Sequence, residues 1–202
     1  MTTFYIIRHA QKEQGNFYNP RLRHQDEPIS QKGQAEAVKL WPYLCDKEIS
    51  AIYISGYRRT AETIKYVSQQ LGFAPIIDGR LNEIDNGCIE GLHDKEIQRK
   101  YPEVWRGFHE RSADFRFPEG ETGEEARLRI ADFLEEKRKN DSEANILFIS
   151  HEELIRLLMC HIMNLPVYQR WNFHVDFCSI TEIVYQSDYQ RWKLIRFNQK
   201  LY

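Results

Sequence analysis

The stretch FYIIRHA, residues 4–10, joins a short apolar run to an arginine and a histidine at its end. Two further runs of this kind occur in the chain, AIYI at 51–54 and ILFI at 146–149. All three are continuously apolar and do not alternate with polar residues, which is typical of strands buried on both faces of a parallel sheet. The three runs therefore predict the centre of a mainly parallel β-sheet.

Helical patterns follow the second and third runs. After the second run, apolar residues recur at helical spacing as far as Leu71, and Gly72 is a natural helix end. After the third run, the same spacing continues as far as Ile162. Strands that alternate with helices in this way are the signature of α/β folds.

Two more helices carry recognisable start signals. One begins at Gln31 after Ser30 as N-cap, and Pro42 should kink or end it. Its expected apolar face consists of Ala35, Val38 and Trp41. The other follows Thr122 and Glu125, which are spaced as a capping box.

The fold class that these patterns predict is a three-layer α/β/α sandwich with a mainly parallel central sheet. Residues 178–197 are expected to form a hairpin with its turn near Ser187 and Asp188. Residues 1–202 are expected to form a single domain, since no linker or repeat interrupts the chain. Residues 85–121 fit the strand–helix alternation poorly and are interpreted as a helical insertion that covers the active site.

Composition restricts the classes of partner. The 202 residues carry a formal net charge of −2, so the chain has no overall attraction for nucleic acid or for an anionic membrane. No apolar run approaches the ~20 residues that span a bilayer, and we expect no signal peptide. Four scattered cysteines without a C-x-x-C pair favour free thiols in the cytoplasm. The exposed edge of the C-terminal hairpin could pair two copies as a homodimer.

The residues just after the three apolar runs concentrate positive charge and imidazole. In open α/β sheets, ligands bind at the carboxyl ends of the strands. The basic and imidazole side chains that this rule brings together are Arg8, His9, Arg58, Arg59 and His151. Guanidinium groups hold phosphate or carboxylate oxygens bidentately, and helix N-termini add free N–H groups. The pattern predicts an anion pocket, for a phosphoryl group, in which a neutral histidine can accept that group covalently.

Six segments of the chain form an ordered set between residue 4 and roughly residue 160. They are IIRHA, PISQKGQAEA, YISGYRRTAETI, LNEIDNGCIEGL, PEGETGEEARLR and FISHEELIRLL. Together, and in this order, they resemble the histidine phosphatase superfamily, in the branch that contains the cofactor-dependent phosphoglycerate mutases.

The resemblance implies a role for five residues. His9 would be the nucleophile that accepts the phosphoryl group, while Arg8 and Arg59 would hold its oxygens. His151 would also contact those oxygens. Glu83 would protonate the leaving oxygen and then activate the water that hydrolyses the phosphohistidine. This scheme requires no metal and no cofactor.

Three positions depart from the family pattern or fall outside it. Ala10 and Glu152 stand where the family usually has glycine, and Arg58 falls on a variable position. We expect the Glu152 side chain to point outward, as the first-turn acid of the following helix. His151 and Glu152 also begin the zinc-protease pattern H-E-x-x-H, but Ile155 replaces its second histidine, so a metal site is not predicted.

The predicted function is that of a metal-independent phosphatase, which hydrolyses a small phosphomonoester through a phosphohistidine on His9. Candidate substrate-binding residues in the loop after the nucleophile are Arg21, Arg23 and His24. Two alternatives stay open: a cofactor-dependent phosphoglycerate mutase, and a catalytically weak phosphate-binding or regulatory homologue. The mutases are usually longer, and 202 residues leave little room for their substrate-enclosing segments.

Overall fold

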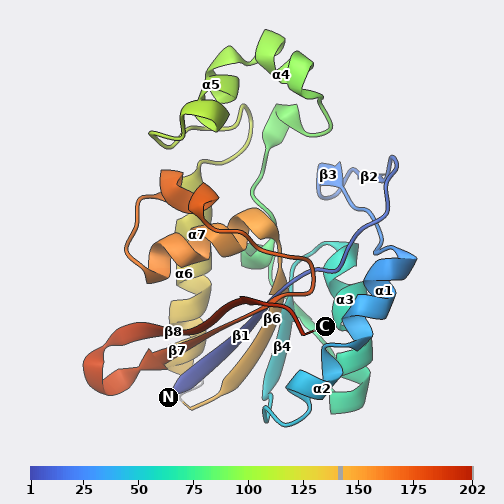
Figure 1. The fold of residues 1–202 in the computed structure, drawn as a ribbon, viewed down its shortest axis with the longest axis vertical. Coiled ribbons are helices and arrows are strands. Elements are labelled where there is room, and N and C mark those ends of the chain that lie inside the picture. The colour runs from blue at the N-terminus through green and yellow to red at the C-terminus, as the bar shows by residue number, and fades with distance from the viewer. Residues whose placement is uncertain (141–142, 202) are drawn as a thin grey trace.

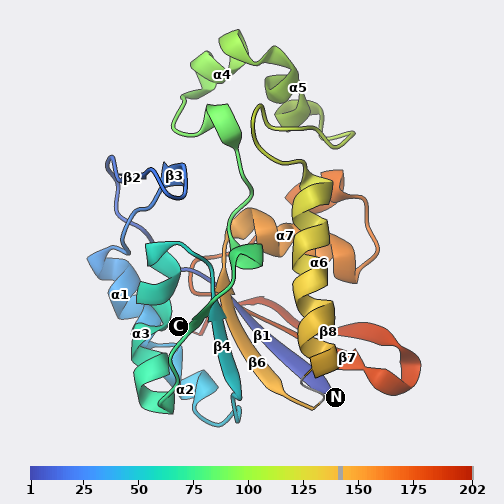
Figure 2. The same cartoon turned by 180° about the vertical axis from the view of Figure 1, so that it is seen from behind.

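A six-stranded sheet lies between two layers of helices in the computed structural model, which describes residues 1–140 and 143–201 (Figures 1 and 2). The strand order is β5-β4-β6-β1-β7-β8. The first four of these strands run parallel, whereas β7 and β8 are antiparallel to their neighbours. The strands are β1 (Thr2–Arg8), β4 (Ala51–Ile54), β5 (Ile76–Ile77), β6 (Asn145–Ser150), β7 (Ile180–Gln186) and β8 (Arg191–Gln199). The predicted fold class is confirmed.

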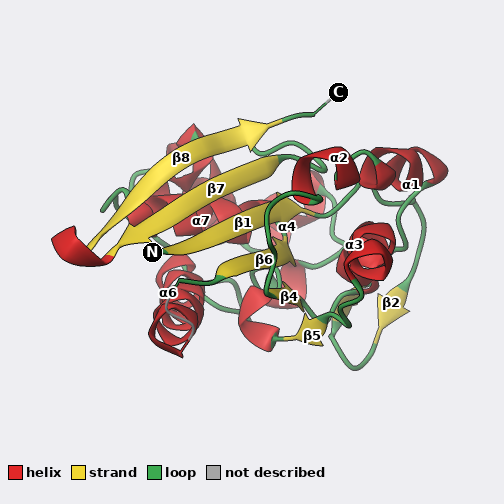
Figure 3. Cartoon of the chain, turned by 90° about the horizontal axis from the view of Figure 1, so that it is seen from below, coloured by secondary structure: helices red, strands yellow, loops and turns green. Residues whose placement is uncertain are grey.

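The helices are divided between the two faces of the sheet (Figure 3). On one face lie α1 (Gln31–Val38), α2 (Trp41–Leu44) and α3 (Arg58–Leu71). On the other face lie α6 (Gly123–Asn140) and α7 (Glu152–Ile162). In the described part of the chain, no helix is both long and apolar enough to cross a membrane.

Strand β1 shows why the central strands are continuously apolar. Phe4 and Ile6 belong to the core under α6 and α7, while Tyr5 and Ile7 belong to the core under α1 and α3. None of the four is more than 6% exposed. Successive side chains of a strand point to opposite faces, so a strand with a core on each face has no solvent-facing position.

Local signals fixed several helix ends as expected. Gly72 ends α3 in the left-handed region at φ 73°, and the Ser30 Oγ accepts the Gly33 N–H at the start of α1. At the start of α6, the Thr122 Oγ1 accepts the Glu125 N–H, and the Glu125 carboxylate accepts the Thr122 N–H. The predicted hairpin of β7 and β8 is also present, with its turn in the short helix Ser187–Tyr189.

The apolar face expected for the first helix is wrong. Ala35 and Val38 are exposed, and the buried residues of α1 are Gly33, Glu36 and Ala37. The face that α1 buries is set by a close approach of Gly33 to the backbone of Gln11. A Cβ on Gly33 would lie 2.3 Å from the backbone oxygen of Gln11. The helix therefore packs through its glycine. Pro42, instead of kinking this helix, lies in the first turn of α2.

Residues 85–121 contain the short helices α4 (Asp94–Lys100) and α5 (Pro102–Glu110). Both lie beyond the carboxyl ends of the strands, at the opposite end of the molecule from the chain's N-terminus (Figures 1 and 2). The two ends of this segment are joined by backbone bonds, from Cys88 N–H to Pro118 O at 2.8 Å and from Glu121 N–H to Asp85 O at 3.0 Å. That the segment covers the active site of a single domain stays a prediction.

We predict that Gly33→Ala lowers the free energy of unfolding by about 3 kcal/mol, because the added methyl group would overlap backbone that cannot move aside like a side chain. Thermal or urea unfolding measures this change. The matched control is Gly79→Ala, where a Cβ meets nothing within 4 Å. The control should stay within about 0.5 kcal/mol of the wild type. Equal effects of the two substitutions would contradict the packing argument.

Candidate active site

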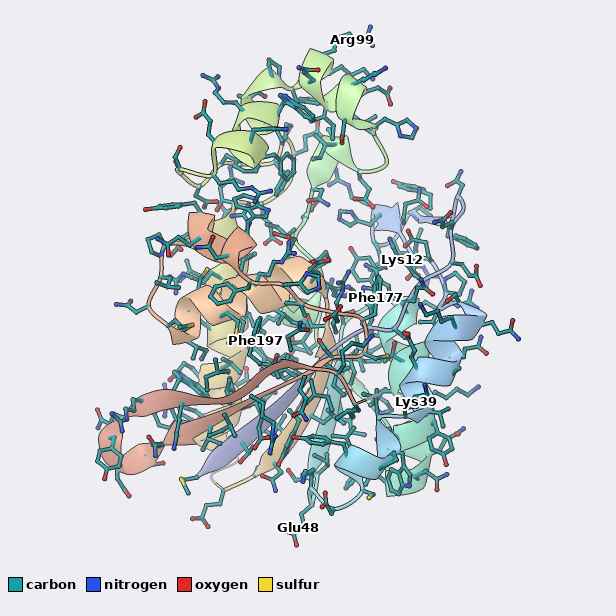
Figure 4. All side chains as sticks on the ribbon, in the orientation of Figure 1. Lys12, Lys39, Glu48, Arg99, Phe177 and Phe197 are labelled. Carbon is teal, nitrogen blue, oxygen red and sulfur yellow. The ribbon has the colours of Figure 1, made fainter. Side chains whose placement is uncertain are left out.

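A cavity of about 200 Å³ opens where β1, β4 and β6 end. Its lining is strongly polar and consists of Arg8, His9, Lys12, His24, Gln25, Tyr57, Arg59, Glu83, Ile84, Asn86, Glu90, Glu152 and Glu153. Figure 4 labels Lys12 and Phe177 in this part of the molecule, well away from Arg99 on α4 and from Glu48 at the far end of the sheet. Four of the five predicted catalytic residues line this cavity. The fifth, His151, is fully buried and packs on His9 with 5.1 Å between the ring centroids.

His9 presents a free ring nitrogen. Its Nδ1 lies 2.8 Å from the Ala10 carbonyl oxygen, and because a carbonyl can only accept, Nδ1 must carry the proton. The lone pair of the neutral ring is then on Nε2. Burial, followed by the charges of Arg59 and Arg8, holds the His9 pKa well below its ordinary 6.5. His9 is therefore a neutral imidazole at pH 7.

Ala10 accommodates its side chain without strain. The residue is fully buried, and it is not among the residues with positive φ. Its N–H donates to the Thr63 Oγ1 at 2.8 Å. The conformation that would favour glycine is therefore not required here.

His151 is hydrogen-bonded through both ring nitrogens. Arg59 Nη2 donates to His151 Nδ1 at 3.2 Å, since a guanidinium has no acceptor. The proton is then on Nε2, which donates to Ser55 Oγ at 2.8 Å. Burial and the Arg59 charge lower the His151 pKa well below 6.5. His151 is thus neutral and orients Arg59.

The two guanidinium groups of the cavity each retain an unused donor. Arg59 is 5% exposed, and its Nη1 contacts Gln25 O at 3.2 Å and Glu27 Oε2 at 3.4 Å. Glu27 also accepts from Lys12 Nζ at 2.6 Å. The Nε atoms of Arg59 and Arg8 are buried and have no hydrogen-bond partner within the residues described. The positive charges of these two guanidinium groups, which both line the cavity, favour an anion there.

Glu152 turns toward the cavity, so the expectation that it points outward is wrong. Its Oε2 lies 2.7 Å from Arg8 Nη2, and its Oε1 pairs with Arg156. The reason is the partial burial of Arg8, whose side chain is 13% exposed and needs a counter-charge. Because Glu152 begins α7, its charge also suits the helix N-terminus.

Glu83 sits at the start of α7. Its carboxylate accepts the Leu154 N–H at 3.2 Å and the neighbouring Ile84 N–H at 3.1 Å. Burial, and then the negative charge of Glu153, raise the Glu83 pKa, while Arg59 and the backbone donors oppose this rise. Glu83 therefore keeps its proton to a higher pH than an ordinary glutamate.

Only one of the three predicted substrate-binding residues lines the cavity. His24 is buried, with Nε2 at 3.2 Å from Asp85 Oδ1 and Nδ1 at 3.6 Å from Glu90 Oε2. Hydrogen bonding to Glu90 raises the His24 pKa. Arg21 and Arg23 are exposed and are not part of the lining.

Other residues of the site were not predicted from the sequence. Tyr57 lines the cavity, and its ring lies 4.2 Å from the Arg59 guanidinium carbon. The sequence signal that points to Tyr57 is its place in the segment YISGYRR, at the end of the second apolar run. Glu27 and Lys12 reach the site because the chain after His9 loops back toward it. No local sequence pattern predicts the path of this loop. Across the described ranges, no group of three or more His, Cys, Asp or Glu side chains could hold a metal ion.

Solved structures of known proteins share this fold. The Shigella flexneri alpha-ribazole phosphatase has a TM-score of 0.81, with 20% identity over 98% of this chain and 96% of that one. The mycobacterial glucosyl-3-phosphoglycerate phosphatase in complex with inorganic phosphate has a TM-score of 0.82, with 21% identity over 98% of each chain. At these identities the likeness concerns the fold alone.

Sequence relatives and a family model cover most of the chain. "Phosphoserine phosphatase 1" of Hydrogenobacter thermophilus is 29% identical over 91% of this chain and 86% of its own length. "Probable phosphoglycerate mutase GpmB" of Shigella dysenteriae is 28% identical over 93% of this chain and 86% of its own length. The model of the histidine phosphatase superfamily (branch 1) matches residues 4–200. With its fold, its paired histidines and this match over nearly the full length, the chain belongs to branch 1 of the histidine phosphatase superfamily.

Proposed function

We propose that this protein is a metal-independent phosphatase that hydrolyses a small phosphomonoester through a phosphohistidine on His9. The observation that carries the proposal is the neutral His9, whose lone pair is on Nε2 and which lines one cavity with the guanidinium-bearing residues Arg8 and Arg59. The cavity volume of about 200 Å³ supports a small substrate. The relative named a phosphoserine phosphatase is consistent with this reaction class.

The first step is phosphoryl transfer to His9. Nε2 attacks the phosphorus, and the bond between phosphorus and the leaving oxygen breaks. Glu83, whose raised pKa favours the protonated form, gives its proton to that oxygen. The alcohol then leaves, and the phosphoryl group remains bonded to Nε2.

The second step returns the enzyme to its starting state. The ionised Glu83 takes a proton from a water molecule, whose oxygen attacks the phosphorus. The bond between phosphorus and Nε2 breaks, and inorganic phosphate forms. His9 is again neutral and Glu83 is again protonated, so the cycle balances.

Three side chains stabilise the charge on the phosphoryl oxygens in this scheme. Arg8 and Arg59, which both line the cavity, donate guanidinium N–H groups. His151 holds Arg59 through Nδ1, which accepts. A direct hydrogen bond from Nδ1 to a phosphoryl oxygen requires that contact to open and Nδ1 to carry a proton, because a phosphoryl oxygen also only accepts.

Phosphoglycerate mutase is the second candidate function, because relatives named as such match the chain over 93% of its length. A mutase and a phosphatase share the transfer to histidine and differ in the acceptor of the second transfer. The measurement is 3-phosphoglycerate isomerisation with and without a bisphosphate primer. We expect hydrolysis and no primer-dependent isomerisation, and primer-dependent isomerisation would favour the mutase.

We predict that His9→Ala lowers hydrolysis of an aryl phosphate by at least about 10³-fold, because the substitution removes the nucleophile. Phosphate release is measured with a chelator present. The matched control is His109→Ala, an exposed histidine on α5 that does not line the cavity and should keep wild-type turnover. Wild-type activity that chelator abolishes would contradict the proposal, and so would no turnover at any pH between mildly acidic and neutral. The latter result would favour the phosphate-binding homologue.

We predict that kcat/KM is highest on the acidic side of neutrality. His9 must be neutral, and because its pKa is depressed, the rate falls on acidification only below pH 6.5. Glu83 must be protonated, and because its pKa is raised above 4.5, the rate falls as pH rises through that higher value. A pH–rate profile measures both the fall in rate on acidification and the fall in rate as pH rises. The fall as pH rises should be absent in Glu83→Gln. A rate that still rises above pH ~8 would contradict the role of Glu83.

A further inference from the structure

Glu152 places a carboxylate directly against Arg8, one of the two guanidinium groups that line the cavity. We propose that Glu152 competes with the phosphoryl group for Arg8 and thereby lowers the affinity of the site for inorganic phosphate. The inference rests on the proposed function in one respect, since it takes this cavity as the phosphoryl site. Its consequence is weak retention of the phosphate product.

The contact between the two side chains creates the competition. Glu152 Oε2 lies 2.7 Å from Arg8 Nη2, and the two side chains are 25% and 13% exposed. An incoming phosphoryl oxygen must either displace the carboxylate from Nη2 or bind Arg8 beside it. The first choice breaks a partly buried ion pair, and the second brings two anions together. Either choice weakens phosphate binding.

Arg8 does not need Glu152 to stay in place. Its Nη1 donates to the Val175 carbonyl oxygen at 2.5 Å, and its guanidinium carbon lies 4.0 Å from the centre of the Phe177 ring. The Arg8 backbone is fixed in the sheet opposite Ser150. Removal of the Glu152 charge would therefore leave the guanidinium positioned and available.

Arg156 keeps Glu152 partly neutralised. It pairs with Glu152 Oε1 and, through its other Nη atom, with Glu153. When phosphate engages Arg8, Glu152 still has this second counter-charge. Loss of Arg156 would leave Arg8 as the one cation paired with Glu152 in the described residues, which would strengthen its hold on Arg8.

The test measures the dissociation constant of inorganic phosphate by isothermal titration calorimetry in four proteins: wild type, Glu152→Gln, Arg156→Met and the double variant. We expect Glu152→Gln to bind phosphate about tenfold more tightly, the order of magnitude of one charge contact in a partly exposed site. Arg156→Met should bind about threefold more weakly. In the Glu152→Gln background, Arg156→Met should cost less affinity than it costs the wild type, because the part of the Arg156 effect that acts through Glu152 is absent and only its pairing with Glu153 remains.

Two results would overturn the inference. One is an unchanged or raised dissociation constant in Glu152→Gln, which would make the carboxylate a scaffold for Arg8. The other is an equal loss of affinity from Arg156→Met with and without Glu152. Thermal unfolding verifies that each variant is folded. In addition, KM for the aryl phosphate should fall in Glu152→Gln, whereas loss of a scaffold would lower kcat.

The inference and the proposed function fail separately. If turnover depends on His9 but the phosphate affinity is the same in Glu152→Gln as in the wild type, the inference is refuted and the proposed function is not. The expected order of phosphate affinities without turnover by the wild type would refute the phosphatase and leave the competition intact.

Discussion

The need to neutralise buried positive charge governs this end of the molecule. Arg8 is paired with Glu152, Arg59 with Glu27, and His24 lies between Asp85 and Glu90. Each pair joins segments that are distant in sequence, and a charge left unpaired there would be costly. The loop after β1, the start of α7 and the stretch after Glu83 are therefore held around one cavity by the charges they exchange. The charged groups that pack these loops together are therefore also the groups that an anion meets in the cavity.

The parts of the fold that depend on residues close together in the sequence could be predicted from the sequence. Strands β1, β4 and β6 are continuously apolar because each has a core on both faces, and the helix ends at Gly72 and Thr122 depend on residues only a few positions apart. The apolar face of α1 could not be predicted in this way. It depends on a contact of Gly33 with the backbone of Gln11, and no periodicity within the helix records a neighbour from another segment.

The residues of the candidate site also divide into those that could be predicted from the sequence and those that could not. Arg8, His9, Arg59 and His151 could be brought together from the sequence because the carboxyl ends of parallel strands share an edge. Glu27 could not, since it reaches Arg59 only through the return of the chain after His9. The direction of Glu152 could not be predicted, because the helix N-terminus and the Arg8 counter-charge both suit a carboxylate, and the shared sheet edge does not decide between them. Arg21 and Arg23, adjacent in sequence to His24, remain at the surface.

Glu83 links the chemistry of the cavity to the integrity of a helix. Its carboxylate accepts backbone N–H groups at the start of α7, where His151 offers no side-chain cap. A charged carboxylate is the better acceptor at a helix N-terminus, whereas the proton donor of the proposed mechanism must be neutral for part of each cycle. Under the proposed mechanism, a substitution of Glu83 that changes its acidity therefore also changes the anchoring of α7.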